Sequence, residues 1–382
     1  MNFELSDDYK AIQETARNFA EKELLPGVID RDEKSEFSTD LFKKMCRLGF
    51  IGLPYPEEFG GQGRDYLSYA LAVEEISKVD GSMGICFSVD TSLYGGSIIN
   101  SMASDEVKKK FLYKVLTGEA IGSFGLTEPN AGSDAGGIQT TARKEGDYYV
   151  LNGSKCFNTN GPVASFTAVY ALTEPELKSK GLSCFVVEKG TPGFTVGKIE
   201  NKMGIRAAQV SELHFNECKI PAENRIAVTG KGFPLALKTL DGGRIGVAAQ
   251  GLGIAKGAFN IAKEYLKVRE QFGKPLFKNQ YLAFKMAELD TEIEAAQYIL
   301  YKAAMDKDNH RPYSVPAAKA KMICTDCAMH VTTECVQMLG GNGYMREYHL
   351  ERMMRDSKIT QIYEGTNEIQ KLVISSAMFR NK

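Results

Sequence analysis

Several features typical of other protein classes are missing from this sequence. Among its 382 residues, 47 Lys and Arg balance 48 Asp and Glu, so the formal net charge is −1 and no basic excess attracts nucleic acid or an anionic membrane. No apolar run is long enough to cross a bilayer. The acidic opening stretch is unlike an export signal. We therefore expect a soluble cytoplasmic protein with neither nucleic acid nor membrane as a partner.

Side chains that many enzymes use for nucleophilic or metal chemistry are also scarce. The chain has four His, no Trp and no Gly-x-Ser-x-Gly motif, so no local signature supports a hydrolase. Its eight Cys, in a long chain without an export signal, indicate reduced thiols. One cluster imitates a metal site and consists of Cys324, Cys327, His330 and Cys335. Its spacing follows one helix, whereas zinc ligands normally come from a turn or two elements, so we expect a buried helix stripe and no metal.

The hydrophobic pattern changes period twice along the chain. It is helical at first, then consists of short aromatic and β-branched runs between turn signals, and then becomes helical again. Because no helices intervene between the central runs, we expect an antiparallel sheet or a small barrel there. The last segment has four long helical patterns with short connections, which indicates an antiparallel bundle. The sequence thus predicts an α+β protein with an N-terminal helical domain (1–119), a middle β domain (120–228) and a C-terminal four-helix bundle (229–382).

The predicted boundaries follow from capping and turn residues. The first helix begins after Ser6 and ends at Pro26. The predicted central strands are Tyr148–Leu151, Phe166–Leu172 and Cys184–Val187. The predicted long helices are Phe233–Val268, Gln280–Lys307, Val315–Leu339 and Arg346–Met378. Three glycines in the first of these helices, Gly251, Gly253 and Gly257, imitate a dinucleotide-binding loop, but no strand precedes them, so we expect close helix packing instead.

Separated stretches rich in Gly and small polar residues provide the most specific signal. They are Gly125–Asp134 (GLTEPNAGSD), Lys155–Gly161 (KCFNTNG), Arg269–Pro275 (REQFGKP) and Gln337–Tyr344 (QMLGGNGY), with Ile362–Gln370 (IYEGTNEIQ) following the last. In this order, these motifs resemble the acyl-CoA dehydrogenase family of flavoproteins, and among them the short-chain, butyryl-CoA dehydrogenase-like members. The resemblance implies that family's fold, FAD as cofactor, an acyl-CoA substrate, a role in fatty acid metabolism, electron-transferring flavoprotein as the electron acceptor, and a homotetramer built as a dimer of dimers.

The resemblance also assigns residues to the cofactor. Phe157 stands where family members often have Trp beside the flavin. Arg269, Gln271 and Phe272 are expected to reach the FAD of a neighbouring subunit. The full set assigned to FAD is Leu126, Thr127, Gly132, Ser133, Phe157, Thr159, Arg269, Gln271, Phe272, Gln337, Gly340, Gly341, Thr366 and Glu368.

Desaturation of an acyl thioester needs a base for the α proton. By resemblance this base is Glu364, and we expect its pKa to rise to roughly 6–7 when substrate expels water. Asp241 and Arg244 lie three residues apart and so share a helix face; in the family these positions bind the CoA part. The residues assigned to the substrate are Ser133, Asp241, Arg244, Gly365, Asp90, Gln250 and Thr360, of which the last two resemble residues that close a short acyl pocket.

The exact acyl group and the direction of the reaction stay open. Asp90 could act as a second base on a cyclic acyl-CoA, such as cyclohexane- or cyclohexene-carboxyl-CoA, but a loop or helix-capping Asp is the more ordinary interpretation. The protein could also run in reverse as an enoyl-CoA reductase, pass electrons to oxygen as an oxidase, or serve as an inactive acyl-CoA-binding scaffold. The retained Glu364 and the FAD motifs argue against the scaffold.

Overall fold

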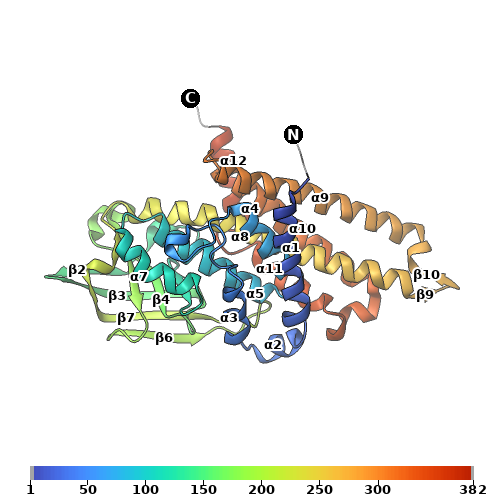
Figure 1. Cartoon of the computed structure of the whole chain (residues 1–382), viewed down its shortest axis with the longest axis horizontal. Coiled ribbons are helices and arrows are strands. Elements are labelled where there is room, and N and C mark those ends of the chain that lie inside the picture. The colour runs from blue at the N-terminus through green and yellow to red at the C-terminus, as the bar shows by residue number, and fades with distance from the viewer. Residues whose placement is uncertain (1–3, 380–382) are drawn as a thin grey trace.

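The structure is a computed structural model that describes residues 4–379 (Figure 1). Its first part is helical. The helices are α1 (Asp7–Phe19), η1 (Ala20–Leu24), α2 (Val28–Lys34), α3 (Thr39–Arg47), η2 (Glu57–Phe59), α4 (Tyr66–Ser77), α5 (Gly81–Ser88), η3 (Val89–Gly95), α6 (Gly96–Ile99) and α7 (Asp105–Leu116). The first helical stretch begins after Ser6 and ends before Pro26, as predicted.

The middle part is a β-sheet with short 3-10 turns. The strands are β1 (Gly122–Gly125), β2 (Thr141–Glu145), β3 (Tyr148–Thr159), β4 (Phe166–Leu172), β5 (Leu182–Glu188), β6 (Phe194–Ile199), β7 (Val210–Pro221) and β8 (Arg225–Ala227). The sheet order is β6-β7-β3-β2-β4-β5-β8, with β1 paired to β4. Most neighbours are antiparallel, as expected, but β1 and β4 run parallel. We expected antiparallel pairs because no helices connect the central strands. A parallel pair needs a long connection between its two strands, and β2 and β3 provide that connection between β1 and β4.

The last part is again helical. It consists of α8 (Gly232–Val268), the hairpin β9 (Glu270–Gln271) and β10 (Lys274–Pro275), α9 (Gln280–Asp308), α10 (Ser314–Leu339), the turns η8 (Gly340–Tyr344) and η9 (Arg346–Tyr348), α11 (Leu350–Thr360) and α12 (Asn367–Met378). The three long helices agree with the prediction, so the fold class is confirmed. The fourth predicted helix is wrong, because it is two helices separated by a loop over residues 361–366. Glu364 (φ +54°) and Gly365 (φ +90°) adopt left-handed backbone conformations there, which a right-handed helix excludes.

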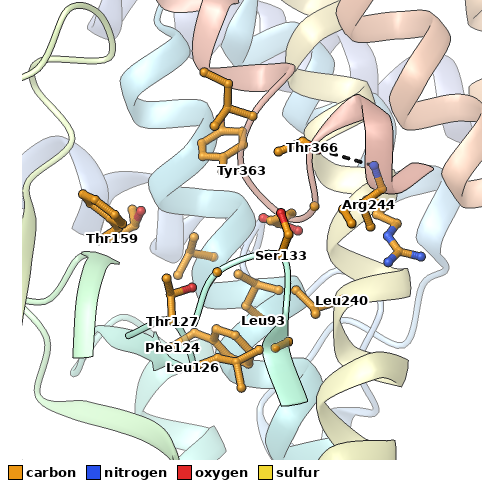
Figure 2. A pocket seen from close by; sticks show the side chains of 18 of the residues that line it. Leu93, Phe124, Leu126, Thr127, Ser133, Thr159, Leu240, Arg244, Tyr363 and Thr366 are labelled. Atoms are coloured by element: carbon orange, nitrogen blue, oxygen red, sulfur yellow. Dashed lines mark hydrogen bonds between the residues drawn. The ribbon is translucent and has the colours of Figure 1, made fainter. Parts of the chain in front are cut away.

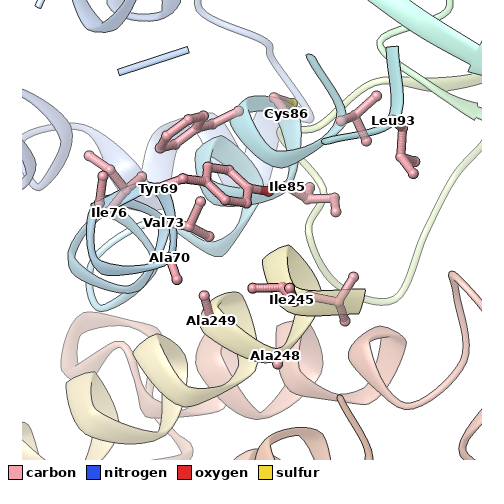
Figure 3. Packing of buried hydrophobic residues seen from close by; sticks show 14 of the residues in the cluster. Tyr69, Ala70, Val73, Ile76, Ile85, Cys86, Leu93, Ile245, Ala248 and Ala249 are labelled. Carbon is pink, nitrogen blue, oxygen red and sulfur yellow. The ribbon is translucent and has the colours of Figure 1, made fainter. Parts of the chain in front are cut away.

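A shared core joins the first and last parts. Buried residues of α4 and α5 face small residues of α8, including Ala248 and Ala249 (Figure 3). A Cβ on Gly253 would lie 2.3 Å from the carbonyl oxygen of Glu74, and one on Gly257 would lie 2.2 Å from that of Lys78. These glycines therefore allow close packing of α8 on α4 and its C-terminal end, as the sequence predicted.

The predicted buried stripe of α10 is confirmed for its cysteines but not for His330, which is exposed. Cys324, Cys327 and Cys335 are buried, while His330 bonds through Nδ1 to Glu292 Oε2 (2.7 Å). Among residues 4–379, no helix combines the length and the apolar character that a bilayer crossing requires.

Candidate active site

A cavity of about 390 Å³ lies where the three parts of the chain meet. Its walls come from α5 and η3, from β1 and the loop after it, from β3, from α8, and from the loop between α11 and α12. In Figure 2, Thr159 and Arg244 lie on opposite sides of the cavity, and Ser133 lies between them. The structure brings together these residues singled out in the sequence: Leu126, Thr127, Gly132, Ser133, Phe157, Thr159, Arg244, Glu364, Gly365 and Thr366.

Glu364 is the acidic side chain that faces this cavity. Both of its carboxylate oxygens are buried, and neither has a hydrogen-bond partner among the described residues. Burial raises the pKa of Glu364 to about 8, although the positive charges of Lys321 and Arg244 oppose the rise. The sequence led us to expect roughly 6–7 once substrate expels water. The fold alone raises the pKa above that range, because the carboxylate is buried from water and has gained no hydrogen-bond donor among the described residues.

The loop that carries Glu364 is held in place from both sides. Gln370 Nε2 donates to the carbonyl oxygens of Gly365 (2.8 Å) and Glu364 (3.4 Å). Thr366 caps α12 by accepting a hydrogen bond from the backbone N–H of Ile369. A non-glycine residue with positive φ is strained by about 1–3 kcal/mol and persists only where its surroundings hold it. These contacts supply that support for Glu364.

A buried ion pair fixes the loop on the opposite wall. Glu128 accepts hydrogen bonds from the backbone N–H groups of Gln139 (2.6 Å) and Thr140 (3.0 Å) and from Lys155 Nζ (2.7 Å). Burial lowers the pKa of Lys155 to about 8, against the effect of Glu128. Because Lys155 also donates to the carbonyl oxygen of Leu126 (3.2 Å), it ties the loop after β1 to β3. Sequence reasoning missed this pair, although a Glu and a Lys inside two of the motifs were signals of it.

Phe157 lies at the open edge of the cavity, with 67% of its surface exposed. Its φ is +57°, and the register of β3 on β7 is irregular between Lys155 and Asn158. Such an irregularity re-aims side chains at functional sites. Here it turns an aromatic ring toward the cavity mouth.

Asp241 and Arg244 form the predicted pair on one face of α8. Arg244 Nη1 lies 2.6 Å from Asp241 Oδ1, and Ser314 Oγ donates to the same oxygen (3.0 Å). Arg244 is 5% exposed and its Nε has no partner among the described residues. The pair is therefore partly buried at the cavity wall and is not an ordinary surface ion pair.

Asp90 does not fit either expectation from the sequence. It lies in η3 with its side chain buried, and it is not among the residues that line the cavity, whereas Val89 and Leu93 of the same element are. Its Oδ1 accepts hydrogen bonds from the backbone N–H of Gly122 (2.8 Å) and from Asn160 Nδ2 (3.3 Å). Burial raises its pKa well above the usual range. The residue does not cap a helix, and its carboxylate contacts Gly122 and Asn160 and does not line the cavity, so its position gives no support to a second base for a cyclic acyl-CoA.

Gln250 and Thr360 also lie behind the cavity wall. Gln250 Nε2 donates to the carbonyl oxygen of Gly81 (2.8 Å), and its Oε1 accepts from the hydroxyl of Tyr363. Thr360 Oγ1 donates to the carbonyl oxygen of Ser357 (2.7 Å). Neither residue lines the cavity, but Tyr363 does. Gln250 therefore contacts a residue of the cavity wall without lining the cavity itself.

Seven of the residues that the resemblance assigns to FAD lie away from the cavity. Arg269, Gln271 and Phe272 belong to the β9–β10 hairpin, at the end of the molecule opposite the β-sheet (Figure 1), and Phe272 is 99% exposed. Gln337, Gly340, Gly341 and Glu368 are likewise exposed. Asn342 Nδ2 donates to the hydroxyl of Tyr265 (2.7 Å), which joins η8 to the last turns of α8. Within one chain, these residues do not meet the cavity.

Comparison with known proteins identifies the family of the chain. Models of the acyl-CoA dehydrogenase N-terminal, middle and C-terminal domains match residues 6–119, 123–218 and 230–379. The chain is 52% identical over 380 residues to the short-chain specific acyl-CoA dehydrogenase of Clostridium acetobutylicum, and the match covers 100% of both.

Solved structures give the same result. Butyryl-CoA dehydrogenase from Megasphaera elsdenii superimposes with a TM-score of 0.97 at 49% identity, with 100% of both chains covered. A chain in a structure reported for the electron-transferring flavoprotein of Acidaminococcus fermentans, in work on flavin-based electron bifurcation, gives 0.98 at 50% identity, again with 100% of both chains covered. This chain belongs to the acyl-CoA dehydrogenase family.

Proposed function

We propose that this protein is an FAD-dependent dehydrogenase that converts a short-chain acyl-CoA to the 2-enoyl-CoA, with Glu364 as the base. One observation carries the proposal: the buried carboxylate of Glu364, which has no hydrogen-bond partner within residues 4–379, faces the cavity that the Gly-rich motifs line. A buried acid without a partner costs folding free energy. An arrangement of this kind is typical of a group poised for proton transfer.

The residues at the cavity fit FAD. The loop after β1 is free of side-chain bulk, because no atom lies within 4 Å of the position that a Cβ on Gly132 would take. Leu126, Thr127, Ser133 and Phe157 surround this open space with backbone groups, hydroxyls and an aromatic ring. FAD bound there supplies the acceptor for the hydride that leaves carbon β of the substrate.

The chain itself handles the proton and the thioester. Glu364 must be ionised to accept the α proton, and a pKa near the working pH is what a general base requires. Its backbone N–H is suited to donate to the thioester oxygen, and one donor of this kind typically contributes about 2.7–4 kcal/mol to stabilisation of the transition state. Arg244, held by Asp241, offers a charged group for the CoA part at the same wall.

The apolar walls support a short acyl group. Ile85, Val89, Leu93, Phe124 and Ile369 line the cavity, and Tyr363, fixed by its hydrogen bond to Gln250, lies among them. One methylene changes transition-state binding by about 1–3 kcal/mol in such a pocket. Butyryl-CoA is therefore the substrate to test first.

The exposed surface supports an oligomer. The β9–β10 hairpin presents Arg269 and the almost fully exposed Phe272 away from the cavity of its own chain. A groove between α8 and α9 is lined by Phe259, Leu266 and Met286, among others. Apolar surface of this kind is typical of an interface. We infer a homotetramer in which these residues contact the adenine end of a partner's FAD.

The electron acceptor and the compartment complete the proposal. The structural relative reported with an electron-transferring flavoprotein supports such a flavoprotein as the acceptor here. All eight cysteines are free thiols, which fits the reducing cytoplasm. There the enzyme would serve fatty acid metabolism.

The test is reduction of the bound flavin by butyryl-CoA without oxygen. We expect the purified protein to be yellow and to bleach when butyryl-CoA is added. Glu364→Gln should retain FAD and lose the bleaching, whereas Glu347→Gln, the same change at an exposed position, should bleach normally. A Glu364→Gln protein that bleaches at the normal rate would refute the assignment of the base.

A further inference from the structure

A buried lysine lies beneath the loop that carries Glu364. The side chain of Lys321, in the middle of α10, is 0% exposed. Lysine is almost never fully buried unless it is paired. Among the described residues it forms no ion pair within 4 Å, and its Nζ donates instead to the side-chain oxygen of Asn367 (2.8 Å). A cation kept in such a position calls for an explanation.

Asn367 is the first residue of α12 and follows directly on the loop over residues 361–366 that carries Glu364. Its backbone N–H donates to the carbonyl oxygen of Gln361 (3.0 Å), so the two ends of the loop meet. Its side-chain Nδ2 donates to Asp326 Oδ1 (2.7 Å), and Gln361 Nε2 donates to the same oxygen (2.7 Å). Lys321 and Asp326 of α10 thus hold both ends of the loop between α11 and α12.

The charge of Lys321 also acts on Glu364. Burial lowers the pKa of Lys321 from its ordinary value, and the negative charge of Glu364 opposes this and favours the protonated amine. The titratable and charged groups that interact with Glu364 or Lys321 from the surrounding elements are Tyr69 of α4, Arg244 of α8, Asp326 of α10, Tyr363 of the loop and Glu368 of α12. Arg244 and Lys321 are the cations that act on Glu364, and Arg244 is already engaged by Asp241.

We propose that Lys321 is a positioning residue for the base: through Asn367 it fixes the loop that carries Glu364, and its positive charge favours the ionised carboxylate that accepts the substrate proton. This inference rests on the proposed function, because it assumes that Glu364 is the base. It assigns a role in catalysis to a residue that does not line the cavity.

Two variants test separately the two parts of this role, which are the positive charge of Lys321 and its link to the loop through Asn367. Lys321→Met keeps the length of the side chain but removes the charge and the donor. We expect the acid limb of the pH dependence of flavin reduction by butyryl-CoA to move up by about one pH unit, because a nearby opposite charge shifts a carboxyl by about 1–3 units. Asn367→Leu breaks the link and leaves the charge, so we expect a lower limiting rate without that upward shift.

Two further variants keep the test decisive. Lys319→Met makes the same change at an exposed position of α10 and should leave both the limb and the rate unchanged. Asp326→Asn keeps an acceptor oxygen but removes a negative charge that supports protonated Lys321. We expect it to move the acid limb in the same direction by a smaller amount. Because Asp326 is exposed, this variant gives an answer even when Lys321→Met does not fold.

The outcomes distinguish the two proposals. If Glu364→Gln is inactive and the Lys321→Met and Asp326→Asn proteins, with normal FAD content, keep the wild-type acid limb, the role of Lys321 is wrong and the base assignment stands. If Glu364→Gln is fully active, the base assignment is wrong and the role of Lys321 fails with it.

Discussion

Replacement of Gly243 by Ala tests whether the position of the Glu364 carboxylate limits the reaction. Gly243 lies in α8, and a Cβ there would lie 1.9 Å from Glu364 Oε2, 3.0 Å from Glu364 Cδ and 2.7 Å from Leu93 Cδ2. Ordinary van der Waals contact begins at 3.4 Å. The carboxylate must therefore move by about 1.5 Å, the difference between the first distance and this limit.

The expected effect falls on the rate and not on the fold. A misplacement of about 1 Å at a reacting group can cost about 10²-fold in rate, so Gly243→Ala should slow flavin reduction by butyryl-CoA at least about 100-fold. The atom in the way is the far end of a flexible side chain, and Ala stabilises a helix by roughly 0.5–1 kcal/mol relative to Gly. The melting temperature and the FAD content should therefore stay close to the wild-type values.

The assay is anaerobic stopped-flow measurement of flavin bleaching, with Gly242→Ala as the matched control. The three atoms nearest to a Cβ on Gly242, at 3.2, 3.7 and 3.8 Å, all belong to Tyr66 and none to Glu364, so this variant should keep the normal rate. Glu364→Asp withdraws the carboxylate by about one bond, roughly 1.5 Å, and in that background Gly243→Ala should cost much less. A Gly243→Ala protein that loads FAD and reacts at the wild-type rate would refute the reasoning.

Other predictions follow from the same contacts. The folded-state pKa of Glu364, about 8, is above its ordinary value of 4.5, so the contribution of this group to stability is present below pH 4.5 and is lost as pH rises through 8. The melting temperature should therefore fall between pH 5 and 9, and Glu364→Gln should reduce this fall. An equal fall in both proteins would contradict the prediction. Lys155→Met leaves Glu128 buried without its cation and should cost about 3–5 kcal/mol in urea unfolding, with weaker FAD retention. Phe272→Ala changes an exposed side chain, so the monomer should fold normally while size-exclusion chromatography shows weaker assembly and titration shows weaker FAD binding.

The order of helices and strands could be predicted from hydrophobic periodicity alone. β4 spans Phe166–Leu172, as predicted, because aromatic and β-branched residues follow one another between clear turn signals. The weaker strands escaped the analysis. β6 has no fully buried residue, so its sequence carries little alternation, and its pairing with β7 depends on tertiary contacts that no local pattern contains.

The candidate site could be predicted in part. The motifs identified many of the residues that line the cavity, but Asp90 was expected at the acyl group, whereas its carboxylate accepts from the Gly122 N–H and only its neighbours Val89 and Leu93 line the cavity. Val89 and Leu93 are four residues apart and so share one face of the helical segment, whereas Asp90, one residue after Val89, points to another side. The role of Lys321 was also hidden, because a lysine in a helical pattern ordinarily indicates a solvated face.

The failure of the fourth predicted helix and the chemistry of the site have the same cause. A continuous helix through residue 364 would keep right-handed dihedral angles, but Glu364 has a φ of +54°. The left-handed turn separates α11 from α12 and turns the carboxylate toward Gly243 and the cavity. Phe157 and Phe272 also have positive φ and also belong to the motifs. Bulky side chains rarely adopt this conformation, and four of the ten non-glycine residues with positive φ among the described residues lie in the motifs: Phe157, Asn160, Phe272 and Glu364. The strain at Glu364 is held by neighbouring helices, and this is why changes at Lys321 or Asn367, outside the cavity, should alter proton transfer inside it.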